Sequence, residues 1–401
     1  MPSKAFEAVV AGHICLDLFP TFPPAAGSTS IQALLSPGKL INVGPLVTST
    51  GGAVSNTGLA LHRLGIATRL MGKVGDDLVG GAILDVLQRY DPTLAEGMIV
   101  TKEHPSSYTI VISPPSVDRI LLHCPGTNNA FGAEDIPYEE LPGSRLFHFG
   151  YPPLMRRMYA DGGRELEAML RRVKHQGLTT SLDMARPDPA SEAGRAPWSE
   201  LLARVLPHVD VFLPSFDETL FMLDRPRFDL LERQTGGDLI KGADAALLRG
   251  LSDRLLEMGV AIAALKLGAE GLYLRTTKDQ AGLASLGPCA PGNLSAWNDR
   301  ELLAPCFQVQ VVGTTGSGDA TIAGFLAGLL HGLPPERVIA AAVAVGACNV
   351  EAADAISGIP TWAEVQRRIQ SGWTRRPVAL SLPEWRWDKT TGIWKGPADG
   401  F

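Results

Sequence analysis

The chain has 401 residues, 45% of them apolar, which is enough to bury a large core and is far from a disordered composition. Its formal net charge of −6 argues against a general nucleic-acid binder and against a membrane-surface binder. The five scattered cysteines favour reduced thiols, no apolar run is long enough to span a bilayer, and the N-terminus lacks the order of a signal peptide. We therefore expect a cytoplasmic globular protein.

Short β-branched or aromatic runs alternate with longer helical patterns along the chain. In chain order, strands are expected at 6–12, 68–74, 145–150, 178–183, 209–214, 261–267, 271–275 and 307–312. Helices are expected between them at 53–64, 78–89, 154–175, 198–206, 244–258, 318–331 and 336–353. This alternation predicts an α/β fold with a doubly wound, mostly parallel sheet flanked by helices. Ligands of such sheets collect at the carboxyl ends of the strands.

Two stretches break the alternation and together predict a small β lid. Residues 19–50 are rich in Pro and Gly, and residues 101–124 contain two short strand patterns around a turn. The tail, residues 373–401, holds four of the chain's seven tryptophans and predicts a β-ribbon packed on the parent domain. We therefore expect one domain over 1–372, which carries the lid, and a Trp-rich C-terminal extension over 373–401.

A glycine pair precedes the first predicted helix, in "TGGAVSNTGLALHRLG" at 50–65. Gly51 and Gly52 can bring the backbone against a polyol, and the amide of Asn56 can both donate to and accept from hydroxyl groups. An Asn in the first turn of a helix is more often a local cap. This segment alone leaves both interpretations open.

The run "ALKLGAEGLYL" at 264–274 indicates a strand, a glycine turn and a second strand. Lys266, Gly268 and Gly271 could approach a nucleotide there. A plain hairpin explains these residues equally well.

The run "VVGTTGSGDATIAGF" at 311–325 joins a predicted strand to a predicted helix through small residues. The strand is expected to end at Val312, and Gly316, Ser317 and Gly318 allow a tight turn into the helix. Successive N–H groups at a helix N-terminus form an anion pocket, which the helix dipole strengthens. The run matches neither GxxxxGK[ST] nor GxGxxG, so a Walker-type phosphate loop and a dinucleotide-binding dehydrogenase are not supported.

Asp319 stands in the first turn of that helix, beside the anion pocket. A carboxylate in this place can take a proton from a hydroxyl group that attacks a bound phosphate. It can also do no more than pair with the positive end of the helix dipole. The sequence around Asp319 allows both roles.

Taken together, these segments resemble the ribokinase-like (pfkB-type) family of carbohydrate kinases, in order over most of residues 6–370. "GHICLD" is similar to the family's first strand, and "GGAVSNTGLALHRLG" and "GKVGDDLVG" are similar to its N-terminal signature. "VVGTTGSGDATIAGF" is similar to its C-terminal signature, the most specific of the set. The resemblance implies a sugar-binding Asp17, an anion hole from Gly316, Ser317 and Gly318, and a catalytic base at Asp319.

A fifth segment, "LPSFDETLF", resembles the family's stretch that organises magnesium and phosphates, which implies a metal role for Glu218. Two positions depart from the family's pattern. Ser215 stands where Asn is usual in this stretch, and Gly313 stands where the C-terminal signature usually begins with Asp. In many members that Asp lies near a monovalent-cation site, so potassium activation is not expected.

The resemblance implies an ATP-dependent kinase that uses Mg²⁺ and phosphorylates a hydroxymethyl group of a sugar or related polyol, and it allows a homodimer. Asp17, Gly51, Gly52 and Asn56 would hold the acceptor hydroxyls, and Lys266, Gly268 and Gly271 would border the nucleotide. One alternative is a nucleoside kinase of the same fold, whose base would need an aromatic clamp such as Phe19, Phe22 or Tyr108. The other alternative is a non-catalytic relative that binds a sugar or a nucleotide.

Overall fold

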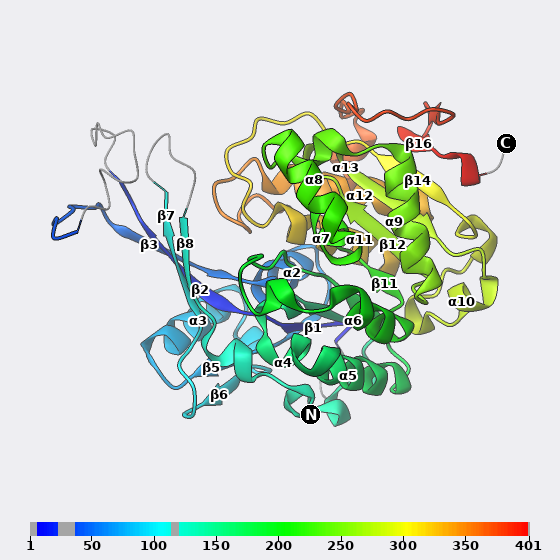
Figure 1. The fold of residues 1–401 in the computed structure, drawn as a ribbon. Coiled ribbons are helices and arrows are strands. Elements are labelled where there is room, and N and C mark those ends of the chain that lie inside the picture. The colour runs from blue at the N-terminus through cyan, green and yellow to red at the C-terminus, as the bar shows by residue number, and fades with distance from the viewer. Residues whose placement is uncertain (1–5, 23–36, 114–119, 400–401) are drawn as a thin grey trace.

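The computed structural model describes residues 6–22, 37–113 and 120–399, and Figure 1 shows their arrangement. Ten strands of these residues form the main sheet. In spatial order they are β15 (Arg386–Asp388), β16 (Ile393–Lys395), β14 (Glu301–Ala304), β13 (Leu272–Thr276), β12 (Ile262–Lys266), β11 (Val211–Phe212), β10 (Thr179–Leu182), β9 (Leu146–Gly150), β1 (Ala8–Gly12) and β4 (Thr68–Met71). The strands from β4 to β12 pair in parallel, and the remaining pairs are antiparallel.

Helices cover both faces of this sheet. One face carries α2 (Ala53–Arg63), α3 (Leu78–Tyr90), α10 (Gln280–Ala284), α11 (Ser317–Leu330), α12 (Pro335–Asn349) and α13 (Trp362–Gln370). The other carries α4 (Arg156–Tyr159), α5 (Arg164–His175), α6 (Trp198–Val205), α7 (Phe216–Leu223), α8 (Arg225–Thr235) and α9 (Ala245–Glu257). The predicted α/β fold with a doubly wound, mostly parallel sheet is therefore confirmed.

Strand β1 shows why both layers form. Ala8 and Val10 belong to the core on one face of the sheet, whereas Val9 and Ala11 belong to the core on the other. Successive side chains of a strand point to opposite faces, so a strand that is apolar at every position needs cover on both.

No helix in the described ranges is both long enough and apolar enough to cross a membrane.

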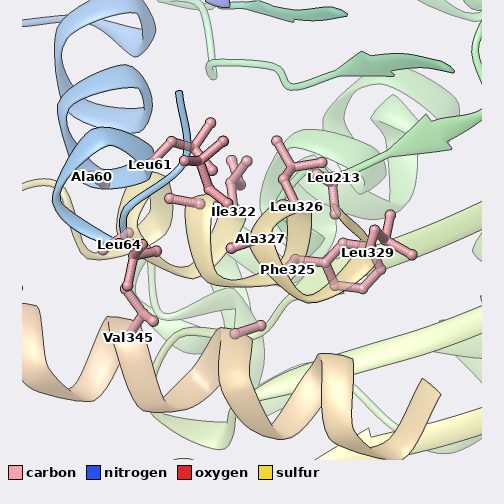
Figure 2. Close-up of a cluster of buried hydrophobic side chains, with 14 of the residues drawn as sticks. Ala60, Leu61, Leu64, Leu213, Ile322, Phe325, Leu326, Ala327, Leu329 and Val345 are labelled. Atoms are coloured by element: carbon pink, nitrogen blue, oxygen red, sulfur yellow. The ribbon is translucent and has the colours of Figure 1, made fainter. Parts of the chain in front are cut away.

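Helix α11 lies between α2 and α12 in the first of these cores. Leu61 of α2, three residues of α11 (Ile322, Phe325 and Leu326) and Val345 of α12 belong to one cluster of buried side chains (Figure 2). All five side chains are buried. Because this packing holds α11 against α2, the N-terminal turns of the two helices are brought together.

A smaller sheet extends from the body at the upper left of Figure 1. Its strand order is β3 (Leu46–Gly51), β2 (Cys15–Pro20), β7 (Tyr108–Ile112) and β8 (Ile120–Cys124). The predicted lid segments 19–50 and 101–124 therefore supply most of this sheet, although β2 already begins at Cys15. Residues 23–36 and 114–119 of those segments lie outside the described residues. Two further short strands, β5 (Lys73–Gly75) and β6 (Ile99–Thr101), pair with each other.

The predicted strand 307–312 is wrong. Within it only Phe307 makes a β-bridge, to Arg375, and the strand beside β13 in the sheet is instead Glu301–Ala304, whose four side chains are buried. The alternation of apolar and polar residues in 307–312 has another cause. Phe307, Val309 and Val311 line a cavity, so the apolar side of this extended segment faces that space instead of a sheet core.

The predicted helix 154–175 is also wrong as one unit, because it is broken into α4 and α5. Asp161, Gly162 and Gly163 lie between them with positive φ angles of 49°, 64° and 77°. Left-handed residues cannot continue a right-handed helix, so "DGG" acts as a turn here.

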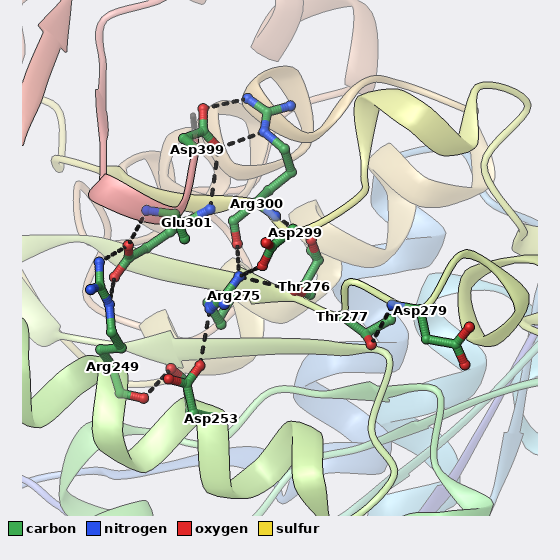
Figure 3. Close-up of polar contacts among 12 residues, drawn as sticks. Arg249, Asp253, Arg275, Thr276, Thr277, Asp279, Asp299, Arg300, Glu301 and Asp399 are labelled. Carbon is green, nitrogen blue, oxygen red and sulfur yellow. Dashed lines mark hydrogen bonds and ion pairs between the residues drawn. The ribbon is translucent and has the colours of Figure 1, made fainter. Parts of the chain in front are cut away.

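The tail adds to the main sheet. β15 and β16 form an antiparallel hairpin, and β16 pairs with β14. Beyond β16, Asp399 forms an ion pair with Arg300, which directly precedes β14 (Figure 3). The C-terminal segment is thus joined to the sheet by backbone pairing and by a charged contact.

Candidate active site

Polar residues gather at the carboxyl edge of the parallel strands. Tyr151 follows β9, Asp183 follows β10 and Lys266 ends β12. These three residues line a cavity of about 380 Å³. The same cavity is lined by Glu218 and Gly268 and by the turn at the start of α11, which comprises Gly316, Ser317, Gly318 and Asp319. This is the edge at which α/β sheets bind their ligands.

Asp319 is one of two buried carboxylates of this cavity, the other being Asp183, and 4% of the Asp319 surface is exposed. Asn56 Nδ2 donates a hydrogen bond to Oδ2 at 3.0 Å, and Thr57 Oγ1 donates to Oδ1 at 3.2 Å. The Tyr151 hydroxyl lies 2.9 Å from Oδ1 and 2.8 Å from Oδ2. Burial raises the pKa of Asp319, and the hydrogen bond from Asn56 and the positive charge of Lys266 oppose that rise.

The turn before Asp319 leaves the start of α11 open to the cavity. Gly316 is the N-cap residue, with φ of 72°, and no side chain caps the helix there. A Cβ at Gly316 would lie 2.6 Å from Ala355 Cβ, so both the backbone conformation and the space require glycine. The first-turn N–H groups of a helix have no partner within the helix. Here Gly316, Ser317 and Gly318 border the cavity, and the Ser317 N–H donates to the Thr314 carbonyl at 3.3 Å.

Lys266 supplies a positive charge to the cavity. Its Nζ lies 2.6 Å from Asp183 Oδ1, and both side chains are largely buried. Burial disfavours the ammonium, but the negative charges of Asp183 and Glu218 outweigh it, so the pKa of Lys266 is raised. Lys266 therefore carries its charge at neutral pH.

Glu218 is held in place by the start of α7. Its Oε2 accepts from the Ser215 N–H at 2.6 Å, and Ser215 Oγ accepts from the Glu218 N–H at 3.2 Å. This reciprocal capping box fixes the carboxylate at the cavity wall. Ser215, which stands at one of the unusual positions of the sequence, thus positions Glu218.

A second, largely apolar cavity of about 280 Å³ adjoins the first, and Lys266, Gly268, Ser317 and Gly318 line both. Gly271 lines only the second. Strands β12 and β13 pair as an antiparallel hairpin around Gly268 and Gly271, so the plain-hairpin interpretation is correct. The hairpin nevertheless places both glycines at a cavity.

The remaining predicted residues lie together at the start of α2. Gly51 ends β3 beside Asp17 of β2, so close that a Cβ at Gly51 would lie 2.2 Å from Asp17 Oδ2. Gly52 is the N-cap residue of α2, which carries Asn56. The lid sheet therefore brings Asp17 to the N-terminus of the helix whose Asn56 contacts Asp319.

Sequence reasoning missed three residues that contact the predicted ones: Thr57, Tyr151 and Asp183. Tyr151 directly follows the predicted strand 145–150, in "FHFGYPP", and Asp183 is the last residue of the predicted strand 178–183, in "SLDMARP". A polar residue at the carboxyl end of a buried strand was therefore the signal available. Their partners lie too far along the chain for that signal to identify them.

Comparisons with known proteins show the family of the chain. A family model described as pfkB family carbohydrate kinase matches residues 24–362. An uncharacterized sugar kinase from Archaeoglobus fulgidus is 24% identical over 295 residues, which are 74% of this chain and 96% of that relative.

Two solved structures show the same fold at low identity. The first is a fructokinase with bound ATP from Xylella fastidiosa, with a TM-score of 0.65 and 19% identity over 91% of this chain and 98% of that chain. The second is a nucleoside kinase from Methanocaldococcus jannaschii, with a TM-score of 0.60 and 18% identity over 92% of this chain and 100% of that chain. Because the family model spans most of the sequence, the chain belongs to the pfkB family of carbohydrate kinases.

Proposed function

We propose that the enzyme transfers the γ-phosphoryl group of ATP to a hydroxymethyl group of a sugar or related polyol, with Asp319 as the general base. One observation carries this proposal. The buried carboxylate of Asp319 lies at the open N-terminus of α11, in a cavity that Lys266 and Glu218 also line. A proton acceptor, a cation and an anion-binding helix end around one space suit phosphoryl transfer to an alcohol.

ATP fits the two adjoining cavities. The apolar cavity, bordered by Gly268 and Gly271, suits an adenine ring. Lys266 lines both cavities and would face the phosphates between them. The N–H groups at the 316–318 turn would stabilise the charge on the transferring group.

Glu218 is the residue that we assign to Mg²⁺. Among the described residues, no group of three or more His, Cys, Asp or Glu side chains could hold a metal ion. Mg²⁺ commonly keeps several waters and binds one or two carboxylates together with substrate phosphates. A single carboxylate fixed at the cavity wall fits that requirement. The bound ion would neutralise phosphate charge.

The acceptor would lie beside Asp17, Gly51, Gly52 and Asn56. Asn56 donates to Asp319 through Nδ2, while its buried Oδ1 has no partner in the described part of the chain. A buried amide oxygen is rarely left without a hydrogen bond. A hydroxyl group of the acceptor could donate to this oxygen next to the base.

A nucleoside acceptor is less well supported. Of the aromatic residues considered for a base clamp, Phe19 lines a separate cavity with Val47 and Tyr90, between the lid sheet and α3. That cavity does not include Asp319. Phe19 therefore does not supply a base clamp in the cavity of Asp319.

The test of the function is acceptor-dependent formation of ADP from ATP and Mg²⁺. A panel of sugars, polyols and nucleosides would be assayed, with thermal shift by each compound in the presence of a non-hydrolysable ATP analogue as a parallel measure of binding. We expect turnover with at least one sugar or polyol. Stabilisation by ATP without turnover on any acceptor would identify a non-catalytic relative instead.

The close approach of Gly51 to Asp17 gives a first prediction. In Gly51→Ala the new Cβ would lie 2.2 Å from Asp17 Oδ2 and must displace the carboxylate. We expect the acceptor KM to rise by roughly tenfold or more, the value of a hydrogen bond to a charged group, while the ATP KM stays unchanged. Gly81→Ala is the matched control, because a Cβ at this exposed position of α3 meets nothing within 4 Å. An unchanged acceptor KM in Gly51→Ala would remove Asp17 from the site.

A second prediction concerns monovalent cations. Gly313 has no side chain to offer, and a Cβ there would lie 2.9 Å from the carbonyl oxygens of Ala352 and Ala353. A carboxylate side chain therefore has little room at this position. We expect turnover to require Mg²⁺ but to change little when sodium is exchanged for potassium at constant ionic strength. A severalfold rise in potassium would contradict this expectation.

A further inference from the structure

The hydroxyl of Tyr151 occupies the side of Asp319 that the other donors leave open. Asn56 reaches Oδ2 and Thr57 reaches Oδ1, one to each oxygen. The Tyr151 oxygen lies at almost equal distances from both oxygens, 2.8 and 2.9 Å, and so sits between them. An acceptor hydroxyl that gives its proton to Asp319 must approach one of these same oxygens to about 2.6–3.2 Å.

The backbone of Tyr151 holds the phenol in this place. Tyr151 has φ of 65° and ψ of 42°, a left-handed conformation that is uncommon for a residue other than glycine and strained for a bulky one. It lies between Gly150, which ends β9, and the pair Pro152 and Pro153, whose φ angles are restricted by their rings. Strain of this kind persists where the surrounding structure enforces it, and it is concentrated at functional sites.

Tyr151 can only act as a neutral donor to the base. Burial and the nearby charge of Asp319 raise the pKa of Tyr151 well above its ordinary value. The phenol therefore keeps its proton throughout the working pH range, and its hydrogen bond stabilises the ionised form of Asp319.

We propose that Tyr151 is a positioning residue that guards the base, which means that it keeps water away from Asp319. Without an acceptor, the Tyr151 hydroxyl is hydrogen-bonded to the Asp319 carboxylate and excludes water from it. When an acceptor binds, its hydroxyl displaces the Tyr151 hydroxyl from one of the two carboxylate oxygens. This inference depends on the proposed function, because it assumes that Asp319 is the base. In the productive step the acceptor oxygen forms a bond to the γ-phosphorus, the bond from that phosphorus to the β–γ bridging oxygen breaks, and the acceptor proton moves to Asp319. A water molecule in the acceptor's place could react in the same way, and ATP would then be hydrolysed without phosphorylation of an acceptor.

The test compares Tyr151→Phe with the unchanged enzyme in two assays, ATP hydrolysis without acceptor and phosphorylation of the best acceptor of the panel. Phe keeps the ring and removes only the hydroxyl, so a water molecule can reach Asp319. We expect acceptor-independent hydrolysis to rise by roughly tenfold or more, the weight of a hydrogen bond to a charged group. The apparent acceptor KM should fall severalfold, because the competing hydroxyl is gone.

Tyr159→Phe is the matched control, since Tyr159 lies on α4 and its ring packs near Trp198. It should change neither assay. If Tyr151→Phe melts too low to assay, Tyr151→Gly removes the same hydroxyl, suits the left-handed backbone and should also raise hydrolysis.

The outcomes separate the two proposals. Unchanged hydrolysis in an active Tyr151 variant would overturn the guard, and so would a rise in acceptor KM at constant kcat, which would make Tyr151 part of the acceptor site. Failure of the unchanged enzyme to phosphorylate any acceptor would instead overturn the proposed function.

Discussion

Asp319→Asn is expected to lower turnover by on the order of 10²–10⁴, the usual contribution of a positioned proton acceptor. Asn is nearly isosteric with Asp but cannot take the acceptor's proton. The variant should still fold, because the Asn carboxamide can accept from Asn56 and donate to the hydroxyl oxygen of Thr57 or Tyr151, which lie around it. It should also still bind ATP, because the proposed phosphate site is made of backbone N–H groups. Turnover, ATP affinity and melting temperature are measured on the same preparation.

The competing role, pairing with the helix dipole, leads to a different result. Loss of a charge from the first turn would then cost about 0.3–1 kcal/mol of stability and leave turnover nearly intact. Glu364→Gln is the matched control, because Glu364 is an acidic residue in the first turn of α13. Near-normal turnover of Asp319→Asn would end the proposal of a base at this position.

The pH profile adds an independent measure. A base must be ionised, so turnover of the unchanged enzyme falls as pH drops through the pKa of Asp319. Burial raises that pKa, so the loss should begin at a higher pH than for an ordinary aspartate, whose pKa is near 3.8. The residual turnover of Asp319→Asn should not show this fall at low pH.

The second large effect is expected from Arg300→Met, in stability rather than activity. Arg300 Nε lies 2.6 Å from Asp399 Oδ1 (Figure 3). Its guanidinium also contacts Glu336, and the Asp399 side chain is only 4% exposed. Removing the cation leaves two carboxylates without their partner. Breaking a buried pair in this way costs about 3–5 kcal/mol, so we expect a fall of that size in the free energy of unfolding.

Denaturant unfolding measures this change, and two variants define its origin. Arg367→Met removes a cation that is 73% exposed and pairs with Glu364, so it should cost no more than about 1 kcal/mol. The double variant Arg300→Met/Asp399→Asn should recover part of the loss, because the uncompensated charge of Asp399 is gone. Equal effects of Arg300→Met and Arg367→Met would mean that the charged contact of the tail stabilises the fold no more than an exposed ion pair does.

The sequence by itself determined the features that depend on local chemistry. The apolar run at 6–12 predicted a strand, and β1 lies there with all five of its residues buried. The glycines before Asp319 and before Asn56 predicted helix starts, and α11 and α2 begin there. Turn conformation and strand burial are properties of a few neighbouring residues, so a single sequence carries them.

Only the tertiary structure decided which of these local features meet. Asn56 and Asp319 are 263 residues apart, Tyr151 and Asp319 are 168 apart, and Asp183 and Lys266 are 83 apart. No periodicity encodes such contacts, because they follow from the strand order and from the packing of α11 against α2. The same reason explains the failed strand at 307–312, whose alternation is as regular as that of a strand. Whether alternate side chains face a sheet core or a cavity depends on what the rest of the chain places beside them.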